Sequence, residues 1–467
     1  MRFNKALFSA MLLLPVGCGA PMTPTPIQHT ATALLPKAVA RSVSNAIDTN
    51  GAEWPEFRRD DQRTGNNPYQ TAITTANVGT LAPKWSKITA GVFASAVVVN
   101  GVVYEGDLKG KLYAWNIANG KLQWSFKSTG SFVSTPYYSN GTLYVGAKGT
   151  VSLGVPSKVY SINAATGAKN WEYDVAAEAQ VDASPMLVNG VVYAGTDAKN
   201  YNKNECDSND QMLALDANTG ALVSTLSLLP PGATYTGADI WSSVALDPSG
   251  NMYVGTGPQC QKNADPLAYS DAILQVNPSQ PTMSVNWSFQ SLLGPGSNKF
   301  DDDFGATPLY VDGMVIDSSK DGYTYAVNST TGAMVWDRQT GPTIGSSATD
   351  GTHLFVPSME WGCAAGAPCG AFQALNVADG SVAWSIPING SNYGFPELAA
   401  PVVSNGIVYA SFNGSIWALN ASTGATLWSY AIPNSIIFGG FTVVNGGVLV
   451  GEYTPQGSFF CFTPGGK

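Results

Sequence analysis

The sequence predicts an all-β fold: an eight-bladed β-propeller of four-stranded antiparallel blades, with the last blade closed by an N-terminal strand. Three observations predict it. Short alternating apolar segments recur along the chain between Asn-Gly and Thr-Gly turns, a pattern typical of antiparallel strands joined by tight turns. In several copies, Trp follows a turn glycine at the fourth position, as Trp124 follows Gly120. The units recur at intervals of roughly 40–60 residues, which is typical of propeller blades.

The strand pattern also decides how the ring closes. Sets of three strands can be counted from Gly101 to Gly446, and each needs one outer strand to complete a blade. The last set has no Trp-bearing strand after it, whereas the segment around Trp85 is such a strand with no set before it. The N-terminal strand therefore completes the last blade and pairs edges that an open sheet leaves exposed. The clean pairs are Gly120 with Trp124, Gly167 with Trp171, Gly332 with Trp336, Gly380 with Trp384, and Gly424 with Trp428.

Three segments of the chain differ in composition. Residues 1–18 have a basic start, an apolar run and a terminal Cys18, the pattern of an export signal of the lipoprotein type, although Pro15 stands where Leu is usual. The apolar run is too short to span a bilayer. Residues 19–50 are rich in Pro, Thr, Ala and Ser and are expected to form a flexible tether, followed by the propeller over residues 51–467. We therefore expect an exported protein, periplasmic or associated with the cell envelope, that is anchored to a membrane only by a lipid on Cys18.

The charge balance argues against nucleic acid as a partner. The chain has 23 Lys and Arg against 32 Asp and Glu, a net charge of −9, and a nucleic-acid binder needs a basic surface. The 50 glycines and the 44% of hydrophobic residues suit a turn-rich β fold.

The cysteines predict disulfides rather than metal binding. Cys363 and Cys369 are close enough in sequence for a small disulfide-closed loop, and Cys206 and Cys260, in insertions of adjacent blades, are a second candidate pair. Cys461 would then be a buried free thiol. With only two histidines in the chain, a zinc site is not expected. The absence of a Cys-x-x-Cys-His motif indicates that the chain carries no covalent haem.

Five segments stand out in order along the chain: WPEFRRDDQRTGNNP (54–68), ITTANVGTLAPKW (73–85), GADIWSSVALDPSGNMYVGTG (237–257), SDAILQVNP (270–278) and FDDDFGATPLYVDG (300–313). Together they resemble the quinoprotein alcohol dehydrogenase superfamily, and within it the polyvinyl-alcohol-dehydrogenase-like branch. The resemblance implies an eight-bladed propeller that binds pyrroloquinoline quinone (PQQ) and a calcium ion at the mouth of the ring. It also implies that an Asp takes the proton of an alcohol while hydride passes to the quinone.

The resemblance assigns roles to individual positions. Trp241 matches the Trp on which the quinone stacks, with core packing as the alternative. Glu205 falls where the family has a calcium-binding Glu, and a solvated loop acid is the alternative. Asp301 matches the family's base and metal ligand, and Asp303 competes for that role if the alignment shifts; a solvated acidic turn is the alternative for this acidic run. Lys320 stands where a basic residue stabilises charge on the reduced quinone, unless it is an ordinary turn lysine.

Two departures from the family pattern weaken the expected cofactor site. Pro258 replaces an Asn that supplies a calcium ligand, and proline offers no side-chain donor. The chain also lacks the pair of adjacent cysteines whose disulfide covers the other face of the quinone in many members.

Two classes of function therefore stay open. The first is a PQQ-dependent alcohol dehydrogenase-like protein that oxidises a small or polymeric alcohol and passes electrons to a separate acceptor. The second is a propeller without a cofactor that acts as a protein-interaction scaffold in the cell envelope, as the similar outer-membrane-protein assembly lipoprotein does. The enzyme needs the acids and Trp241 to face one mouth of the ring, whereas the scaffold needs an exposed apolar patch on one blade.

Overall fold

The computed structural model describes most of the predicted propeller. It covers residues 52–150, 153–176, 179–198, 211–229, 238–258, 268–292, 302–359, 366–390, 399–433 and 435–467. The chain divides into two compact units, Met1–Ser44 and Asn45–Lys467, and all described residues belong to the second. The predicted export signal and tether lie outside the described residues, so these boundaries stay predictions. Among the described residues, no helix is long and apolar enough to cross a membrane.

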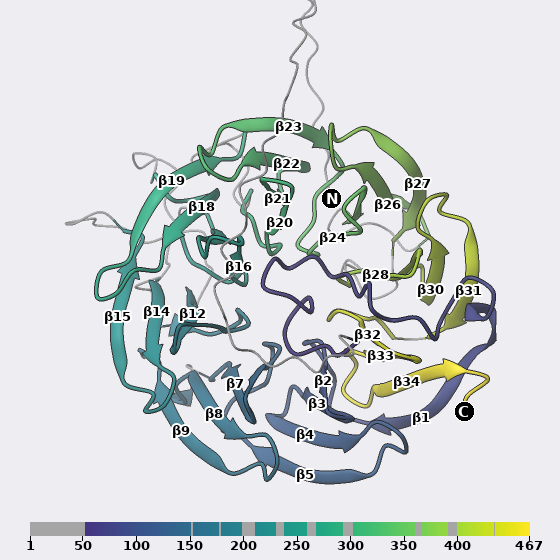
Figure 1. The fold of residues 1–467 in the computed structure, drawn as a ribbon, viewed down its shortest axis with the longest axis horizontal. Helices are drawn as coiled ribbons and strands as arrows, with labels where there is room; N and C mark the ends of the chain where they lie inside the picture. Colours follow the sequence, from purple (N-terminus) through teal and green to yellow (C-terminus); the bar gives the residue numbers. More distant parts are fainter. Residues whose placement is uncertain are drawn as a thin grey trace, which may run out of the picture. The chain divides into compact units, whose positions relative to one another are not determined.

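Eight four-stranded antiparallel sheets surround a common axis, which confirms the predicted propeller (Figure 1). We number the blades in chain order, each from its innermost strand outward. Blades 1 to 4 comprise β2 (Val97–Val99), β3 (Val102–Gly106), β4 (Lys111–Asn116) and β5 (Leu122–Lys127); β6 (Tyr137–Ser139), β7 (Thr142–Ala147), β8 (Lys158–Asn163) and β9 (Lys169–Asp174); β11 (Met186–Val188), β12 (Val191–Gly195), β14 (Gln211–Asp216) and β15 (Leu222–Ser227); and β16 (Ala245–Leu246), β17 (Met252–Gly255), β18 (Ala272–Asn277) and β19 (Ser284–Gln290).

Blades 5 to 8 continue the same order around the ring. They comprise β20 (Leu309–Val311), β21 (Met314–Ser318), β22 (Tyr323–Asn328) and β23 (Met334–Gln339); β24 (Ala348–Thr349), β25 (His353–Met359), β26 (Pro368–Asn376) and β27 (Val382–Asn389); β28 (Val402–Ser404), β29 (Ile407–Phe412), β30 (Ser415–Asn420) and β31 (Thr426–Ala431); and β32 (Thr442–Val444), β33 (Gly447–Gly451), β34 (Ser458–Pro464) and β1 (Leu81–Ile88). A short pair, β10 (Ala179–Gln180) with β13 (Asp197–Ala198), and a 3-10 turn, η1 (Val78–Thr80), complete the described elements.

The N-terminal strand closes the ring as predicted. β1 pairs antiparallel with β34, with Trp85 opposite Cys461, so the first and last described strands share one blade. In Figure 1 the purple β1 lies beside the yellow β34. Cys461 is a buried free thiol, as expected. Cys206, Cys260 and Cys363 lie outside the described residues, so both disulfide pairings stay predictions; Cys369 is buried in β26.

The recurring Gly and Trp form the joints between neighbouring blades. The indole of Trp124 in blade 1 donates its Nε1 hydrogen to the carbonyl of Ala164 in blade 2, 2.9 Å away. It also covers Gly167, where an added Cβ would meet the indole at 2.6 Å. Gly167 has φ of +73°, so glycine is required there for both space and backbone conformation. The same N–H to carbonyl bond is made by Trp85, Trp171, Trp287, Trp336, Trp384 and Trp428.

The joint between blades 3 and 4 is built differently. Ser224 stands where the other blades carry Trp, and its hydroxyl bonds to Gln280 of the next blade at 2.5 Å. Tyr193 donates to the carbonyl of Pro278 at 2.8 Å and accepts from Gln280 at 3.1 Å. Blade 3 has Ser224 in place of the Trp, and the turn of blade 4 around Pro278 has no glycine for an indole to cover. A polar network therefore replaces the indole in this joint.

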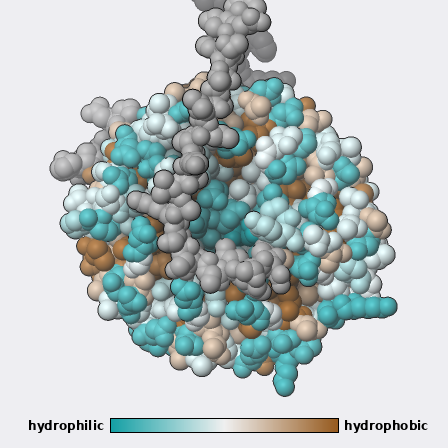
Figure 2. Space-filling model, in the orientation of Figure 1, coloured by the Kyte–Doolittle hydropathy of each residue, from teal (hydrophilic) through white to brown (hydrophobic). Residues whose placement is uncertain are grey.

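Residues 54–67, which we name the axial segment, cross the centre of the ring and bond to its innermost strands. In Figure 1 this purple segment loops through the centre, and in Figure 2 the centre of the same face is hollowed and hydrophilic. The contacts follow the blades in order. They join Trp54 to Val98, Pro55 to Tyr138, Arg63 to Met186, Asp61 to Leu246, Gln62 to Tyr310, Thr64 to Thr349, Gly65 to Val403 and Asn67 to Val443.

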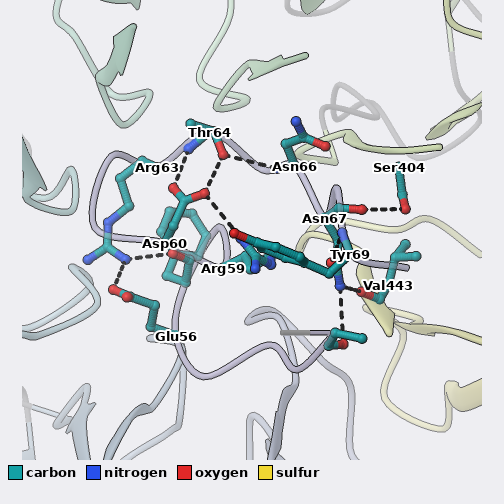
Figure 3. Close-up of polar contacts among 12 residues, drawn as sticks. Glu56, Arg59, Asp60, Arg63, Thr64, Asn66, Asn67, Tyr69, Ser404 and Val443 are labelled. Atoms are coloured by element: carbon teal, nitrogen blue, oxygen red, sulfur yellow. Dashed lines mark hydrogen bonds and ion pairs between the residues drawn. The ribbon is translucent and has the colours of Figure 1, made fainter. Parts of the chain in front are cut away.

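Charged side chains hold the axial segment in shape (Figure 3). Arg63 is buried; its Nη1 lies 2.6 Å from Glu56 Oε2 and its Nε donates to the carbonyl of Val244 at 2.7 Å. Burial raises the pKa of Glu56 well above its usual value, with Asp61 adding to the effect and Arg63 opposing it. Arg58 is also buried and donates to the carbonyls of Pro401 and Ser347.

Candidate functional site

Three of the predicted site residues meet on one side of the ring axis. Trp241 Nε1 donates to Asp303 Oδ2 at 3.1 Å, and Lys320 Nζ lies 2.9 Å from Asp303 Oδ1. The Lys320 ammonium also sits over the Trp241 ring, 4.9 Å from its centroid. Both carboxylate oxygens of Asp303 thus have a partner. Asp303 is only 2% exposed, so the site is largely shielded from water. The aromatic, acidic and cationic residues singled out in the sequence therefore form one cluster.

The backbone around Asp303 is fixed by blades 4 and 5. The Lys320 N–H donates to the carbonyl of Asp303 at 3.0 Å, and the Phe304 N–H donates to Thr256 at 3.2 Å. Gly305 lies directly against the Trp241 indole, where an added Cβ would overlap the ring. The glycine in GATPL is thus needed for this close approach, which the sequence did not reveal.

A further buried acid lies close to this cluster. Asp317, in β21, is 2% exposed, and its Oδ1 accepts a bond from the Ser318 N–H at 2.8 Å. Burial raises the pKa of Asp317 well above its usual value; the Ser318 bond opposes this, and the charge of Asp303 adds to it. Asp317 is therefore biased toward its protonated form beside the Asp303 carboxylate.

A second ion pair lies across blades 2 and 3. Lys148 Nζ is 2.5 Å from Asp182 Oδ2. Burial alone lowers the pKa of Lys148, but Asp182, Asp197 and Asp239 outweigh it, so the pKa lies above its usual value. Asp182 and Trp241 line the same cavity on the ring axis, which has a volume of about 130 Å³.

The same cavity contains six hydroxyl side chains that the sequence analysis missed. They occupy equivalent positions just ahead of the innermost strands, and we name them the hydroxyl ring: Ser95, Thr135, Ser184, Ser243, Thr307 and Ser346. The recurrence of a Ser or Thr just ahead of the innermost strand in six of the eight blades, as in Thr135-Pro136 and Thr307-Pro308, is the signal that could have found them.

The predicted calcium ligands cannot be placed with this cluster. Glu205 and Asp301 lie outside the described residues, so their shared metal site stays a prediction. Within the described ranges, no group of three or more His, Cys, Asp or Glu residues is arranged to hold a metal ion.

The cluster suits a PQQ-like ligand in its chemistry. Trp241 offers an indole face that is only partly buried, and Lys320 brings a cation suited to an anionic quinone. Stacking on the covered face would require the Lys320 ammonium to move off the ring. The cavity bounded by described residues is smaller than the roughly 300–1,000 Å³ of typical ligand pockets, so only part of such a cofactor fits within it.

Comparison with known proteins gives two kinds of relative. Quinohemoprotein alcohol dehydrogenase ADH-IIG of Pseudomonas putida is 26% identical over 345 residues, which are 62% of this chain and 46% of that protein. Outer membrane protein assembly factor BamB of Yersinia pestis is 24% identical over 375 residues, 77% of this chain and 82% of that protein. Polyvinylalcohol dehydrogenase of Sphingopyxis sp. is 23% identical over 453 residues, 83% and 68% of the two chains. The chain thus spans about half the length of its quinohemoprotein relatives: the matched part is 46% of one relative and 50% of another.

Solved structures agree on the fold. Quinohemoprotein alcohol dehydrogenase from Comamonas testosteroni has a TM-score of 0.74 at 18% identity, covering 92% of this chain and 83% of that one. BamB from Moraxella catarrhalis has a TM-score of 0.60 at 15% identity, covering 82% and 99%. The sequence also matches the family described as "Outer membrane protein assembly factor BamB" over residues 58–287 and 209–464. Because these matches span most of the propeller, the chain belongs to this family of PQQ-like β-propellers.

Proposed function

We propose that the chain is an exported quinoprotein alcohol dehydrogenase-like protein that binds PQQ at the mouth of the ring and oxidises an alcohol. The observation that carries this proposal is the cluster of Trp241, Asp303 and Lys320 beside the axial cavity. A scaffold has no evident need to bring an indole, a buried carboxylate and a cation together at that place. The relatives that are alcohol dehydrogenases support the same chemistry.

Each residue of the cluster has a role in this proposal. PQQ, when bound, supplies the hydride acceptor. Trp241 provides the aromatic face against which a planar ring packs. Lys320 stabilises negative charge next to that face. Asp303 takes the proton from the alcohol. Asp301 and Glu205 hold the calcium ion. Because the chain has no Cys-x-x-Cys-His motif, electrons would leave to a separate acceptor.

A binding experiment tests the proposal without requiring turnover. The purified full chain is titrated calorimetrically with PQQ, with and without calcium. We expect saturable binding that weakens at least about tenfold in Trp241→Leu and in Lys320→Met, because each variant removes a direct contact worth about 1.4 kcal/mol or more. Lys169→Met is the matched control, since it removes an exposed ammonium that pairs only with Glu172 and should leave binding unchanged. No binding at high PQQ concentration would refute the dehydrogenase proposal.

One observation favours a second candidate, an envelope scaffold. By sequence, the match to BamB covers 82% of that relative, compared with 46% and 50% of two quinohemoprotein relatives. On this alternative the chain is held at the membrane by a lipid on Cys18 and contacts another envelope protein. Deleting the gene would then lower the amount of assembled outer-membrane proteins, and Cys18→Ser would reproduce the defect. A deletion without that effect speaks against the scaffold.

A further inference from the structure

The hydroxyl ring links the blades around the axis by one repeated bond. Each hydroxyl oxygen accepts the backbone N–H of the equivalent residue in the preceding blade, at 2.9–3.0 Å. The bonds run from Gly440 to Ser95, and then through Thr135, Ser184, Ser243 and Thr307 to Ser346. The series is interrupted where Ala400 and Gly440 stand in blades 7 and 8, because neither has a hydroxyl.

These hydroxyls keep an unused donor. All six are at most 6% exposed, and the hydrogen bond found for each among the described residues uses the hydroxyl oxygen as acceptor. A hydroxyl that accepts one N–H still has its own proton and a second lone pair. All six line the axial cavity, and leaving buried donors unpaired is unfavourable. The cavity is therefore built for an occupant rich in hydrogen-bond acceptors.

The hydroxyl ring lies next to the cluster of Trp241, Asp303 and Lys320, because Trp241 lines the same cavity. Trp241 and Asp182 each precede a ring residue, Ser243 and Ser184, by two positions. Beyond the ring, the axial segment closes the channel, and its Phe57 lines the cavity. The wall on the other side includes Phe93 and Phe438, whose rings stack with centroids 4.6 Å apart. The axial cavity is therefore lined by aromatic rings at its ends and by hydroxyl groups between them.

The charges at this cavity select against an anionic occupant. Asp182 Oδ2 is paired with Lys148, and the carboxylate of Asp303 is paired with Lys320. Asp197 and Asp239 add negative charge near Lys148, so an anionic occupant is disfavoured. Asp182 Oδ1 is buried without a hydrogen-bond partner among the described residues. It needs a donor, which an ionised carboxylate group lacks. The occupant must both accept from the hydroxyl ring and donate to Asp182, and neutral hydroxyl groups do both.

The volume sets the size. A dry protein cavity of roughly 150 Å³ holds benzene, so about 130 Å³ admits a molecule of about six heavy atoms. We propose that the hydroxyl ring is the binding site for one small neutral polyol, of the size of glycerol or erythritol. Its hydroxyls meet the ring and Asp182, and its C–H faces pack on the aromatic ends. The site involves no redox step, and because Trp241 lines the same cavity, PQQ and the polyol would compete for part of it.

Calorimetric titration of the full chain with erythritol, in buffer free of glycerol, tests the proposal. We expect saturable binding by the wild type and binding about two- to tenfold weaker in Thr135→Val, which removes one hydroxyl at nearly constant volume. Ala400→Leu fills the cavity without touching any hydroxyl and should abolish binding. Ala400→Ser adds a hydroxyl in blade 7, at the position that follows Ser346 in the hydroxyl ring, and should tighten binding.

Thermal unfolding of each variant separates a loss of binding from a loss of folding, and Ala400→Ser gives a gain that misfolding cannot mimic. Glycerate is the matched anionic probe and should not compete with erythritol. The proposal is overturned if the wild type does not bind erythritol, if glycerate binds as well, or if Ala400→Leu binds normally. A crystal soaked in erythritol that shows ordered water only inside the hydroxyl ring also overturns it.

Discussion

Glu105 is a buried acid whose titration should be visible in the stability of the whole propeller. It is 0% exposed in β3; Oε1 accepts the Gly106 N–H at 2.9 Å, and Oε2 has no partner among the described residues. Burial raises its pKa well above 4.5, the Gly106 bond opposes this, and Asp107 adds to it. The equivalent positions in blades 2 and 4 are Val145 and Val254, so the fold itself does not require an acid here.

A folded pKa above the unfolded one means that the native state binds the extra proton. Stability from Glu105 is therefore fully present below the unfolded pKa and is lost as pH rises through the folded pKa. We expect the free energy of unfolding of Glu105→Gln, taken relative to that of the wild type, to be about 1–3 kcal/mol higher at pH 8 than at pH 4. Urea midpoints of both proteins at the two pH values measure this, and shifts from other acids cancel in the difference. An identical difference at both pH values would contradict the prediction.

At the residue scale the sequence found the unusual side chains and missed the regular ones. Trp241, Asp303 and Lys320 stood out because they depart from the repeat or match a family pattern, and the structure brings their side chains into contact. Thr135 and its equivalents went unnoticed because a lone Ser or Thr before a strand has no special pattern. Their significance comes from six copies that line one axial cavity, which is a property of the closed ring.

The axial segment shows a similar limit at the scale of an element. The strands were predictable because alternation and turn residues are local signals. Residues 54–67, by contrast, carry no local signal of a buried central position, since Arg58, Arg63 and Glu56 are residue types that are normally exposed. Their burial depends on carbonyl groups such as those of Val244 and Pro401, which are far away in the sequence. No local rule connects such partners.

The buried Arg63 should be the most sensitive side chain of the axial segment. Arg63→Met removes the bonds to Glu56, Phe57 and Val244 and leaves buried acceptors unpaired. We expect a loss of about 3–5 kcal/mol in the free energy of unfolding, measured by urea denaturation. The matched control is Arg338→Met, which removes one partly buried bond to Gly380 and should cost about 1 kcal/mol.

A double variant identifies the cause of that loss. Glu56→Leu with Arg63→Met leaves no unpaired acid behind, so its destabilisation should be smaller than the sum of the two single losses. Strict additivity would show that Glu56 and Arg63 act independently and that the ion pair does not hold the axial segment.

At the scale of the whole molecule, the sequence predicted closure by counting outer strands, and the count needed no knowledge of contacts. What it did not reveal is that the joints are nearly interchangeable. Trp85 and Trp336 are 9% and 8% exposed, and each donates to a carbonyl of the next blade, at 2.7 and 2.9 Å. They cover Gly120 and Gly380 in the same manner. The two differ chiefly in that Trp85 lies on β1, in the blade formed by the two ends of the described chain.

This difference should appear in unfolding kinetics rather than in equilibrium stability. Trp85→Ala and Trp336→Ala should each lower the free energy of unfolding by about 3–5 kcal/mol, because each removes a buried indole and its bond. Contacts between distant parts of a chain carry the largest loop-closure entropy and are expected to form after the folding transition state. Losing them mainly speeds unfolding. Stopped-flow unfolding in urea should therefore be faster for Trp85→Ala than for Trp336→Ala. Trp85 also packs against Phe459 of β34, near the other end of the described chain, whereas Trp336 bonds to Val377 of the next blade in sequence. Equal unfolding rates at equal stability would mean that the ring has no preferred joint at which it opens, and that closure by β1 is energetically no different from any other blade contact.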